Sequence, residues 1–234
     1  MLTPHRLLEK NRAWRERMQS RDPHLFDQLA AGQSPDVLWI GCADSRVPPS
    51  QIADCNPGEL FVHRNIANVI TEADLNSMSV LQFAVEALKV RHVIVCGHYD
   101  CSGVKESLSN SASGLLGHWL QPIRNLVHHY ADELEDLKAK AQWDRCCELN
   151  VAEQVKRVAD TPIMQQAWKQ GQEPTVHGWI YRLNQGDLCD LDVSVSAATL
   201  NSAARSRSKK KSARRSQNKK SARSSTKRKL SSSS

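Results

Sequence analysis

The hydrophobic pattern of the chain consists of short apolar runs that alternate with segments of helical periodicity. Three runs have the length and composition of buried strands, at residues 36–42, 60–63 and 91–97. Residues 75–88 lie between the second and third runs and carry Leu, Met and Val at helical spacing. Buried strands that alternate with helices predict an α/β fold with a mostly parallel β-sheet flanked by helices.

The flanking segments extend this pattern. Two short amphipathic helices are predicted at residues 7–17 and 23–29, and together they indicate an N-terminal helical arm. Downstream, helical character continues at 115–140, 150–158 and 162–169, the last opening with a Thr-Pro cap. Two final strands, 176–183 and 188–195, flank the turn Asn184-Gln-Gly-Asp187 and predict a hairpin near the edge of the sheet.

Charge is unevenly distributed along the 234 residues. Of the 32 basic residues, 13 lie in residues 201–234, which contain no acid, so the first 200 carry 19 basic and 25 acidic residues. The sequence pI of about 9.1 therefore belongs to the C-terminal segment and does not indicate a nucleic-acid-binding domain. We divide the chain into an N-terminal helical arm (1–35), an α/β domain (36–200) and a Ser/Lys/Arg-rich tail (201–234).

The tail offers almost nothing to bury, and we expect it to be disordered. Its basic clusters would bind polyanions non-specifically, with an affinity that falls steeply with salt. The alternatives are a solvated extension without a partner and a C-terminus that arises from a frame error.

The chain has the character of an intracellular protein. No apolar stretch reaches the roughly 18 to 20 residues that a membrane-spanning helix needs, and the first 20 residues have no apolar signal-peptide core. The seven cysteines are odd in number and irregularly spaced, which argues for reduced thiols rather than a disulfide framework. The sequence predicts a cytoplasmic protein without membrane association.

Metal-ligating side chains follow two of the predicted strands. Cys42 ends the first, and His98 and Cys101 follow the third, so all three belong at the carboxyl edge of a parallel sheet. Two thiolates and one imidazole suit zinc, and three protein ligands leave a fourth position open. The alternative is a buried histidine with two structural thiols. Asp44 and Arg46 favour a reactive site, because a purely structural zinc has no need of such a pair.

Two motifs in this region carry a family resemblance. Cys42-Ala-Asp-Ser-Arg46 and Gly97-His-Tyr-Asp-Cys101 together resemble the motifs of β-class carbonic anhydrases. Arg64-Asn-Ile-Ala-Asn68 and the pair Gln33 and Pro35 add to the resemblance, which covers roughly residues 1–197. One departure is Ser102-Gly103, where many members have two glycines.

The resemblance implies a carbonate dehydratase, a zinc lyase that catalyses the reversible hydration of carbon dioxide to bicarbonate and a proton. It implies one Zn²⁺ per subunit, bound by Cys42, His98 and Cys101, beside a dyad of Asp44 and Arg46. It also implies a homodimer or homotetramer, in which Gln33 hydrogen-bonds substrate across a subunit boundary.

A regulatory site is implied by resemblance to one subset of the family. In that subset, residues of the types of Trp39, Arg64 and Tyr181 bind bicarbonate away from the catalytic centre. Asp44 then leaves its arginine and becomes a zinc ligand in a closed state, which predicts inhibition by bicarbonate and low pH. The alternative interpretation is that the two aromatic residues are core residues and that Arg64 is a structural ion-pair partner.

Two other functions compete with this hypothesis. One is a hydrolase of carbonyl sulfide or carbon disulfide on the same scaffold, since these linear three-atom substrates make similar demands on a pocket. The other is a zinc protein without catalytic activity, anchored to polyanions by its tail. Removal of residues 201–234 distinguishes this non-catalytic protein from an enzyme. An enzyme should keep its catalysis without the tail, whereas a protein that acts through polyanion binding should lose its main activity.

Overall fold

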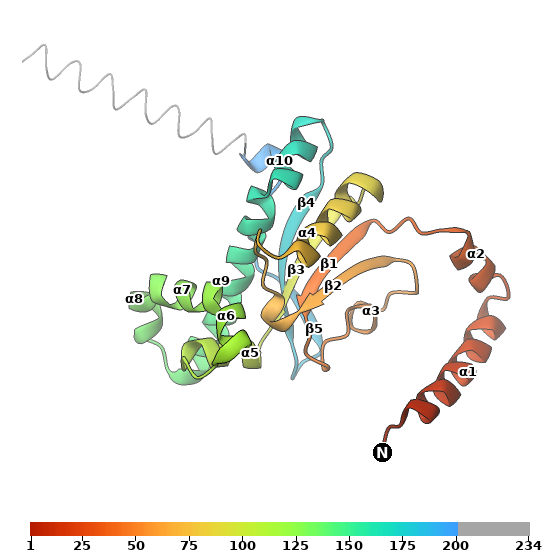
Figure 1. The fold of residues 1–234 in the computed structure, drawn as a ribbon, viewed down its shortest axis with the longest axis horizontal. Helices are drawn as coiled ribbons and strands as arrows, with labels where there is room; N and C mark the ends of the chain where they lie inside the picture. Colours follow the sequence, from red (N-terminus) through yellow and green to blue (C-terminus); the bar gives the residue numbers. More distant parts are fainter. Residues whose placement is uncertain (201–234) are drawn as a thin grey trace, which may run out of the picture. The chain divides into compact units, whose positions relative to one another are not determined.

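A computed structural model of the chain describes residues 1–200, and their fold is drawn in Figure 1. Residues Met1–Ser194 form one compact unit, and a second unit begins at Val195. The tail predicted to be disordered, 201–234, lies outside the described residues. Among the helices of residues 1–200, none combines the length and apolar character that crossing a bilayer requires.

A five-stranded sheet forms the centre of the first unit, with the strand order β2-β1-β3-β4-β5. β1 pairs in parallel with β2 and β3, and β3 pairs in parallel with β4, whereas β5 is antiparallel to β4. The predicted mostly parallel sheet is therefore confirmed, and so is the hairpin at its edge. The strands are β1 (Val37–Cys42), β2 (Leu60–Asn65), β3 (His92–His98), β4 (Thr175–Arg182) and β5 (Asp187–Asp190).

Helices account for most of the remaining chain, as predicted. They are α1 (Pro4–Arg21), α2 (Leu25–Ala31), α3 (Pro49–Ile52), α4 (Leu75–Gln82), α5 (Ser102–Leu108), α6 (Gly114–Trp119), α7 (Gln121–His129), α8 (Ala131–Glu135), α9 (Ala139–Asp160) and α10 (Pro162–Lys169). A 3₁₀ turn spans Ile66–Asn68, and a π-helical turn, Phe83–Ala87, continues α4.

Three elements differ from the sequence-based prediction by more than a few residues. The single helix expected over 115–140 is three short helices, α6 to α8, because Pro122 cannot continue a preceding helix and starts α7 instead. The helix expected over 150–158 is the C-terminal part of the longer α9. The last strand ends at Asp190 rather than Val195.

The central strands β1 and β3 are buried on both faces, which explains their continuous apolar runs, whereas burial alternates along β4. α9 packs along β3 and β4 (Figure 1). The strand residues that alternate toward one face include Leu38, Val95 and Ile180, each 0% exposed. On the other face, Trp39 and Ile94 form a smaller apolar cluster.

The N-terminal arm contributes little to this core. Thr3 caps α1 by accepting a hydrogen bond from the backbone N–H of Arg6, and no residue of α1 or α2 is buried. Trp14 packs edge-on against Phe26, with 5.9 Å between the ring centroids, so the two helices contact each other.

Candidate metal centre

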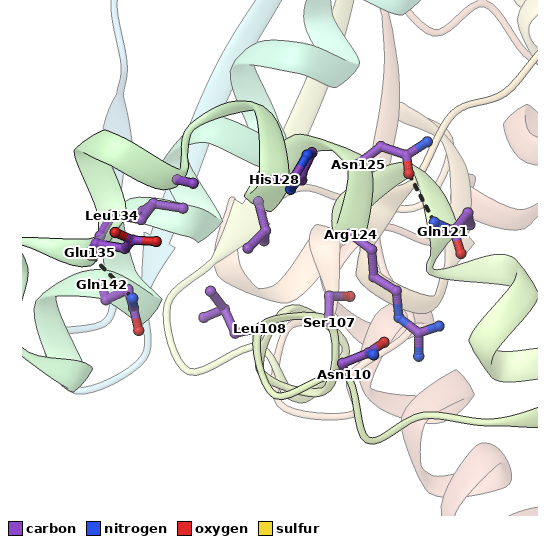
Figure 2. A pocket seen from close by; sticks show the side chains of 12 residues that line it. Ser107, Leu108, Asn110, Gln121, Arg124, Asn125, His128, Leu134, Glu135 and Gln142 are labelled. Carbon is purple, nitrogen blue, oxygen red and sulfur yellow. Dashed lines mark hydrogen bonds between the residues drawn. The ribbon is translucent and has the colours of Figure 1, made fainter.

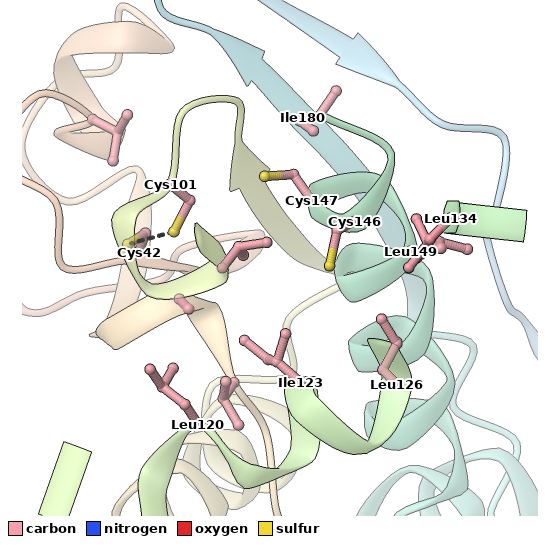
Figure 3. Close-up of a cluster of buried hydrophobic side chains, with 14 residues drawn as sticks. Cys42, Cys101, Leu120, Ile123, Leu126, Leu134, Cys146, Cys147, Leu149 and Ile180 are labelled. Carbon is pink, nitrogen blue, oxygen red and sulfur yellow. Dashed lines mark hydrogen bonds between the residues drawn. The ribbon is translucent and has the colours of Figure 1, made fainter. Parts of the chain in front are cut away.

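The three predicted zinc ligands meet at the carboxyl ends of two neighbouring parallel strands. Cys42 is the last residue of β1, His98 is the last of β3, and Cys101 directly precedes α5. Their ligand atoms lie within 4.8 Å of one another, and 4.0 Å separates the two sulfur atoms. Figure 3 shows the two cysteine side chains facing each other within a cluster of buried hydrophobic side chains. Within residues 1–200, no other group of three or more such side chains is arranged to hold a metal.

The chemistry and spacing of these donors fit zinc. His98 Nδ1 donates to the carbonyl of Tyr99 at 2.8 Å, which leaves the lone pair on Nε2. That Nε2 is buried and has no hydrogen-bond partner among the described residues, as expected for an atom that binds a metal. Tetrahedral zinc with Zn–S bonds of about 2.3 Å would separate two sulfurs by about 3.8 Å, close to the observed spacing.

The two thiols influence each other's ionisation. Their mutual hydrogen bond lowers the pKa of Cys42, and His98 lowers it further. The same contact with Cys42, together with burial, raises the pKa of Cys101. The pair therefore loses one proton readily and resists losing the second, and a divalent cation between the sulfurs removes that resistance.

The carboxylate of Asp44 is held beside this centre by a bidentate ion pair. Arg46 Nε donates to Oδ1 at 2.9 Å and Nη2 donates to Oδ2 at 2.7 Å, while the backbone N–H of Arg46 also donates to Oδ1. These bonds, above all those of the Arg46 side chain, lower the pKa of Asp44 to about 2. Asp44 Oδ2 lies 3.8 Å from His98 Nε2, so a carboxylate that stays ionised at neutral pH borders the metal position.

Backbone contacts around the centre involve residues that the sequence did not single out. The indole of Trp143 donates to the carbonyl of Cys101 at 3.0 Å. The carbonyl of Asp100 accepts from Arg46 Nη2 at 3.2 Å, and Asp100 has a positive φ of 58°. Neither contact has a sequence signal, because each depends on where a distant helix or strand end places a carbonyl group.

A buried amide network connects α9 to the segment that supports the second cysteine. Gln154 accepts from the backbone N–H of Ile70 at 2.8 Å, and Asn150 donates to the carbonyl of Ala67 at 3.0 Å. A Cβ on Gly103 would lie 3.0 Å from the Cβ of Ala67. Glycine at this position therefore lets α5, which begins directly after the second cysteine, approach this segment closely.

The three residues of the predicted bicarbonate site lie on one face of the sheet. The register pairs Arg64 with Gly41, which lies two residues after Trp39 and therefore on the same face of the sheet. It pairs Tyr181 with His98, which lies on that face as well. Trp39 and Tyr181 belong to the same apolar cluster. Arg64 donates from Nε to the carbonyl of Cys42 at 2.7 Å and from Nη2 to the carbonyl of Asp44 at 2.5 Å. Arg64 thus touches the backbone of the catalytic loop, and its contacts here are not ion pairs.

Gln33 lies apart from these groups. It is an exposed residue between α2 and β1, and within residues 1–200 no hydrogen bond joins it to the metal centre of its own chain. The geometry of a single chain thus leaves its predicted role across a subunit boundary open.

A separate pocket of the described residues lies away from these groups. It has a volume of about 750 Å³ and is lined by polar residues of α5, α7 and α8, including Arg124, Asn125 and His128 (Figure 2). None of the predicted site residues lines it, and we assign the chemistry to the strand ends instead.

Comparison with known proteins identifies the family. The family model described as carbonic anhydrase matches residues 37–188. A carbonic anhydrase of Emericella nidulans is 45% identical over 192 residues, which cover 82% of this chain and 84% of that protein. A tetrameric β-carbonic anhydrase of Sordaria macrospora has a TM-score of 0.78 and 37% identity, covering 82% of this chain and 98% of that one. This chain is a β-class carbonic anhydrase.

A further solved relative agrees with this assignment. The β-carbonic anhydrase of Coccomyxa, solved in complex with acetazolamide, has a TM-score of 0.80 and 39% identity, covering 84% of this chain and 89% of that one. The chain is therefore a zinc lyase that interconverts carbon dioxide and bicarbonate, and its Cys-His-Cys cluster is able to hold the metal.

Proposed function

We propose that Cys42, His98 and Cys101 hold the catalytic zinc, and that Asp44 and Arg46 orient the reacting groups in the hydration of carbon dioxide. One observation carries the proposal: a carboxylate held by an arginine lies 3.8 Å from an unpartnered, buried imidazole nitrogen. A zinc site that only stabilised the fold would gain nothing from this charged pair beside it.

The roles of the side chains follow from their ionisation. Zinc bound at this centre supplies a nucleophile at neutral pH, because coordination lowers the pKa of water. With a pKa of about 2, Asp44 is too weak a base to remove a proton efficiently near pH 7. It acts instead as a hydrogen-bond acceptor that orients the nucleophile toward carbon dioxide. Arg46 keeps this carboxylate ionised and in place.

Substitution of one ligand tests the metal assignment. Cys42→Ser should lower the zinc content well below one ion per chain and abolish fast hydration, whereas Cys189→Ser should change neither. Zinc content measured by atomic emission, together with stopped-flow hydration rates, gives both readouts. Full zinc occupancy in Cys42→Ser would contradict the assignment.

We also propose that bicarbonate inhibits the enzyme by binding near Trp39, Arg64 and Tyr181. The contacts of Arg64 support this, because an oxyanion would compete for the donors that now bind the backbone carbonyls of Cys42 and Asp44. Loss of those bonds would free the loop and let Asp44 leave Arg46 for the metal. In this closed state Asp44 would take the position on the zinc that the nucleophile needs, and low pH would favour the same state.

Kinetics at two pH values test this regulation. Activity should fall between about pH 9 and about pH 7 and depend sigmoidally on bicarbonate. Tyr181→Phe should make that dependence hyperbolic while it preserves hydration at the higher pH. Hyperbolic kinetics with full activity at about pH 7 in the wild type would refute the proposal.

Assembly into a homodimer or homotetramer is a further part of the proposal. The Sordaria macrospora relative is tetrameric, and exposed Gln33 would complete the site of a neighbouring subunit. Gln33→Ala should then lower hydration without loss of zinc or of the oligomer, as judged by light scattering. A fully active monomer would contradict this role.

The tail and the cellular location stay predictions. We propose that residues 201–234 bind polyanions non-specifically through their 13 Lys and Arg residues and take no part in catalysis, in a cytoplasmic enzyme. Truncation after residue 200 should leave hydration unchanged and abolish retention on heparin at low salt. Equal retention of the truncated and full chains would refute the binding role.

A further inference from the structure

Two histidines lie together on the first residues of β3 and β4, at the opposite ends of these strands from the zinc ligand His98. His92 is the first residue of β3, and His177 is the third of β4. The register pairs Ile94 with His177, so the two histidines belong to the same face of the sheet. His92 Nδ1 lies 3.0 Å from His177 Nε2. This pair has no part in the catalytic chemistry described above.

A third side chain orients one of the imidazoles. His177 Nδ1 lies 3.1 Å from the hydroxyl oxygen of Ser194. When Nδ1–H donates to that hydroxyl, the lone pair of Nε2 faces the ring of His92. Metal-binding histidines are typically held in this way, with the second ring nitrogen donating to an oxygen.

The spacing of the two facing nitrogens suits one shared ion. Metal–nitrogen bonds of about 2.1 Å at right angles place two ligand nitrogens about 3.0 Å apart. The rings would have to rotate so that both lone pairs converge, but they would not have to move closer. His92 is exposed, so water can occupy the remaining coordination positions.

The surroundings of the pair also suit a cation. Burial and the nearby His92 lower the pKa of His177, while Asp190 opposes the effect, so the ring is neutral and able to coordinate at pH 7. Asp36 is close enough to His92 for the histidine to influence its ionisation, although Arg91 pairs with this carboxylate. The surroundings of the pair therefore include the carboxylates of Asp36 and Asp190 and the guanidinium of Arg91.

We propose that His92 and His177 form a second metal site, which binds a borderline divalent transition ion such as Ni²⁺, Cu²⁺ or Zn²⁺. Ser194 orients His177 for this purpose. The site is separate from the Cys42 centre and does not depend on the roles proposed for that centre.

Titration of the intact enzyme with nickel tests the site. Zinc-loaded full-length protein, with one zinc per chain verified, is titrated with Ni²⁺ by calorimetry in a buffer that does not coordinate metals. Wild type should bind one further equivalent, and retained zinc shows that nickel has not exchanged into the catalytic centre. His92→Gln and His177→Gln should each weaken binding by about tenfold or more, and Ser194→Ala by roughly tenfold.

A matched control is available in His118, an exposed histidine of α6. His118→Gln should leave the nickel affinity unchanged, and all variants should keep wild-type hydration rates because they lie far from the zinc ligands along the strands. Crystals soaked in nickel should show an anomalous peak between Nδ1 of His92 and Nε2 of His177. Equal nickel affinity in wild type and the His92→Gln/His177→Gln double variant, or binding fully explained by zinc exchange, would overturn the proposal.

Discussion

Replacement of Gly97 by alanine should destabilise the enzyme through a single steric contact. A Cβ at this position would lie 2.5 Å from Cγ2 of Val151, well inside van der Waals contact. Val151 lies on α9 and is 0% exposed, and a β-branched side chain in a helix has one strongly preferred rotamer. The side chain cannot turn away, so β3 and α9 must move apart, and this costs about 1–3 kcal/mol of unfolding free energy.

A double-mutant cycle isolates this contact. Val151→Ala alone should cost roughly 1.5–3 kcal/mol, for lost apolar burial and the cavity left behind. In Gly97→Ala/Val151→Ala the new methyl group enters the vacated space. The double variant should therefore be more stable than the sum of the single changes predicts, by about 1–2 kcal/mol, within the range seen for residues in contact.

Urea unfolding at one protein concentration measures the three variants, with zinc content determined for each. Val158→Ala is the matched control, because Val158 is equally buried on α9 but is not among the atoms nearest to Gly97. Gly97→Ala combined with Val158→Ala should be additive. Additivity in the Val151 cycle as well would refute the steric argument. Because Gly97 directly precedes His98, the same displacement should also weaken zinc binding.

Three further predictions concern the surroundings of the metal. Trp143→Phe should remove the hydrogen bond to the Cys101 carbonyl and weaken zinc affinity by roughly tenfold, as measured by competition with a chelator. Unchanged affinity would show that Trp143 does not position Cys101 for the metal. Gln154→Leu should leave the N–H of Ile70 without its acceptor and cost about 1–3 kcal/mol in urea unfolding, whereas a neutral effect would show that another group replaces the amide. The folded-state pKa of Asp44 is depressed from 3.8 to about 2, so its contribution to stability is present above about pH 4 and is lost as pH falls toward 2. In Asp44→Asn the free energy of unfolding should therefore fall less steeply on the acid side of the stability–pH profile. Superimposable profiles of the variant and the wild type would contradict this.

The central sheet and the clustering of Cys42, His98 and Cys101 were predictable from local sequence patterns. The apolar runs ending at Cys42 and Gly97 are long enough to be buried strands, and parallel strands bring their carboxyl ends together. That rule is sufficient to place His98 and Cys101 beside Cys42, as the structure does.

Other features depend on contacts between distant segments and could not be predicted. The bond from Trp143 to the carbonyl of Cys101 joins residues 42 positions apart, and the bond from Gln154 to Ile70 joins residues 84 apart. Pro122 marks the break between α6 and α7 in the sequence, but the break at Tyr130, between α7 and α8, has no such local signal.

The most direct test of the proposed mechanism is stopped-flow hydration of carbon dioxide at about pH 9 by wild type and Asp44→Asn, each with its zinc content determined. Asp100→Asn serves as the control, because the side chain of Asp100 pairs with Lys140 and only its backbone carbonyl contacts Arg46. We expect one zinc per chain in all three proteins, fast hydration by wild type and Asp100→Asn, and a loss of at least about 100-fold in Asp44→Asn. Fast hydration by zinc-loaded Asp44→Asn would contradict the proposed role of the carboxylate.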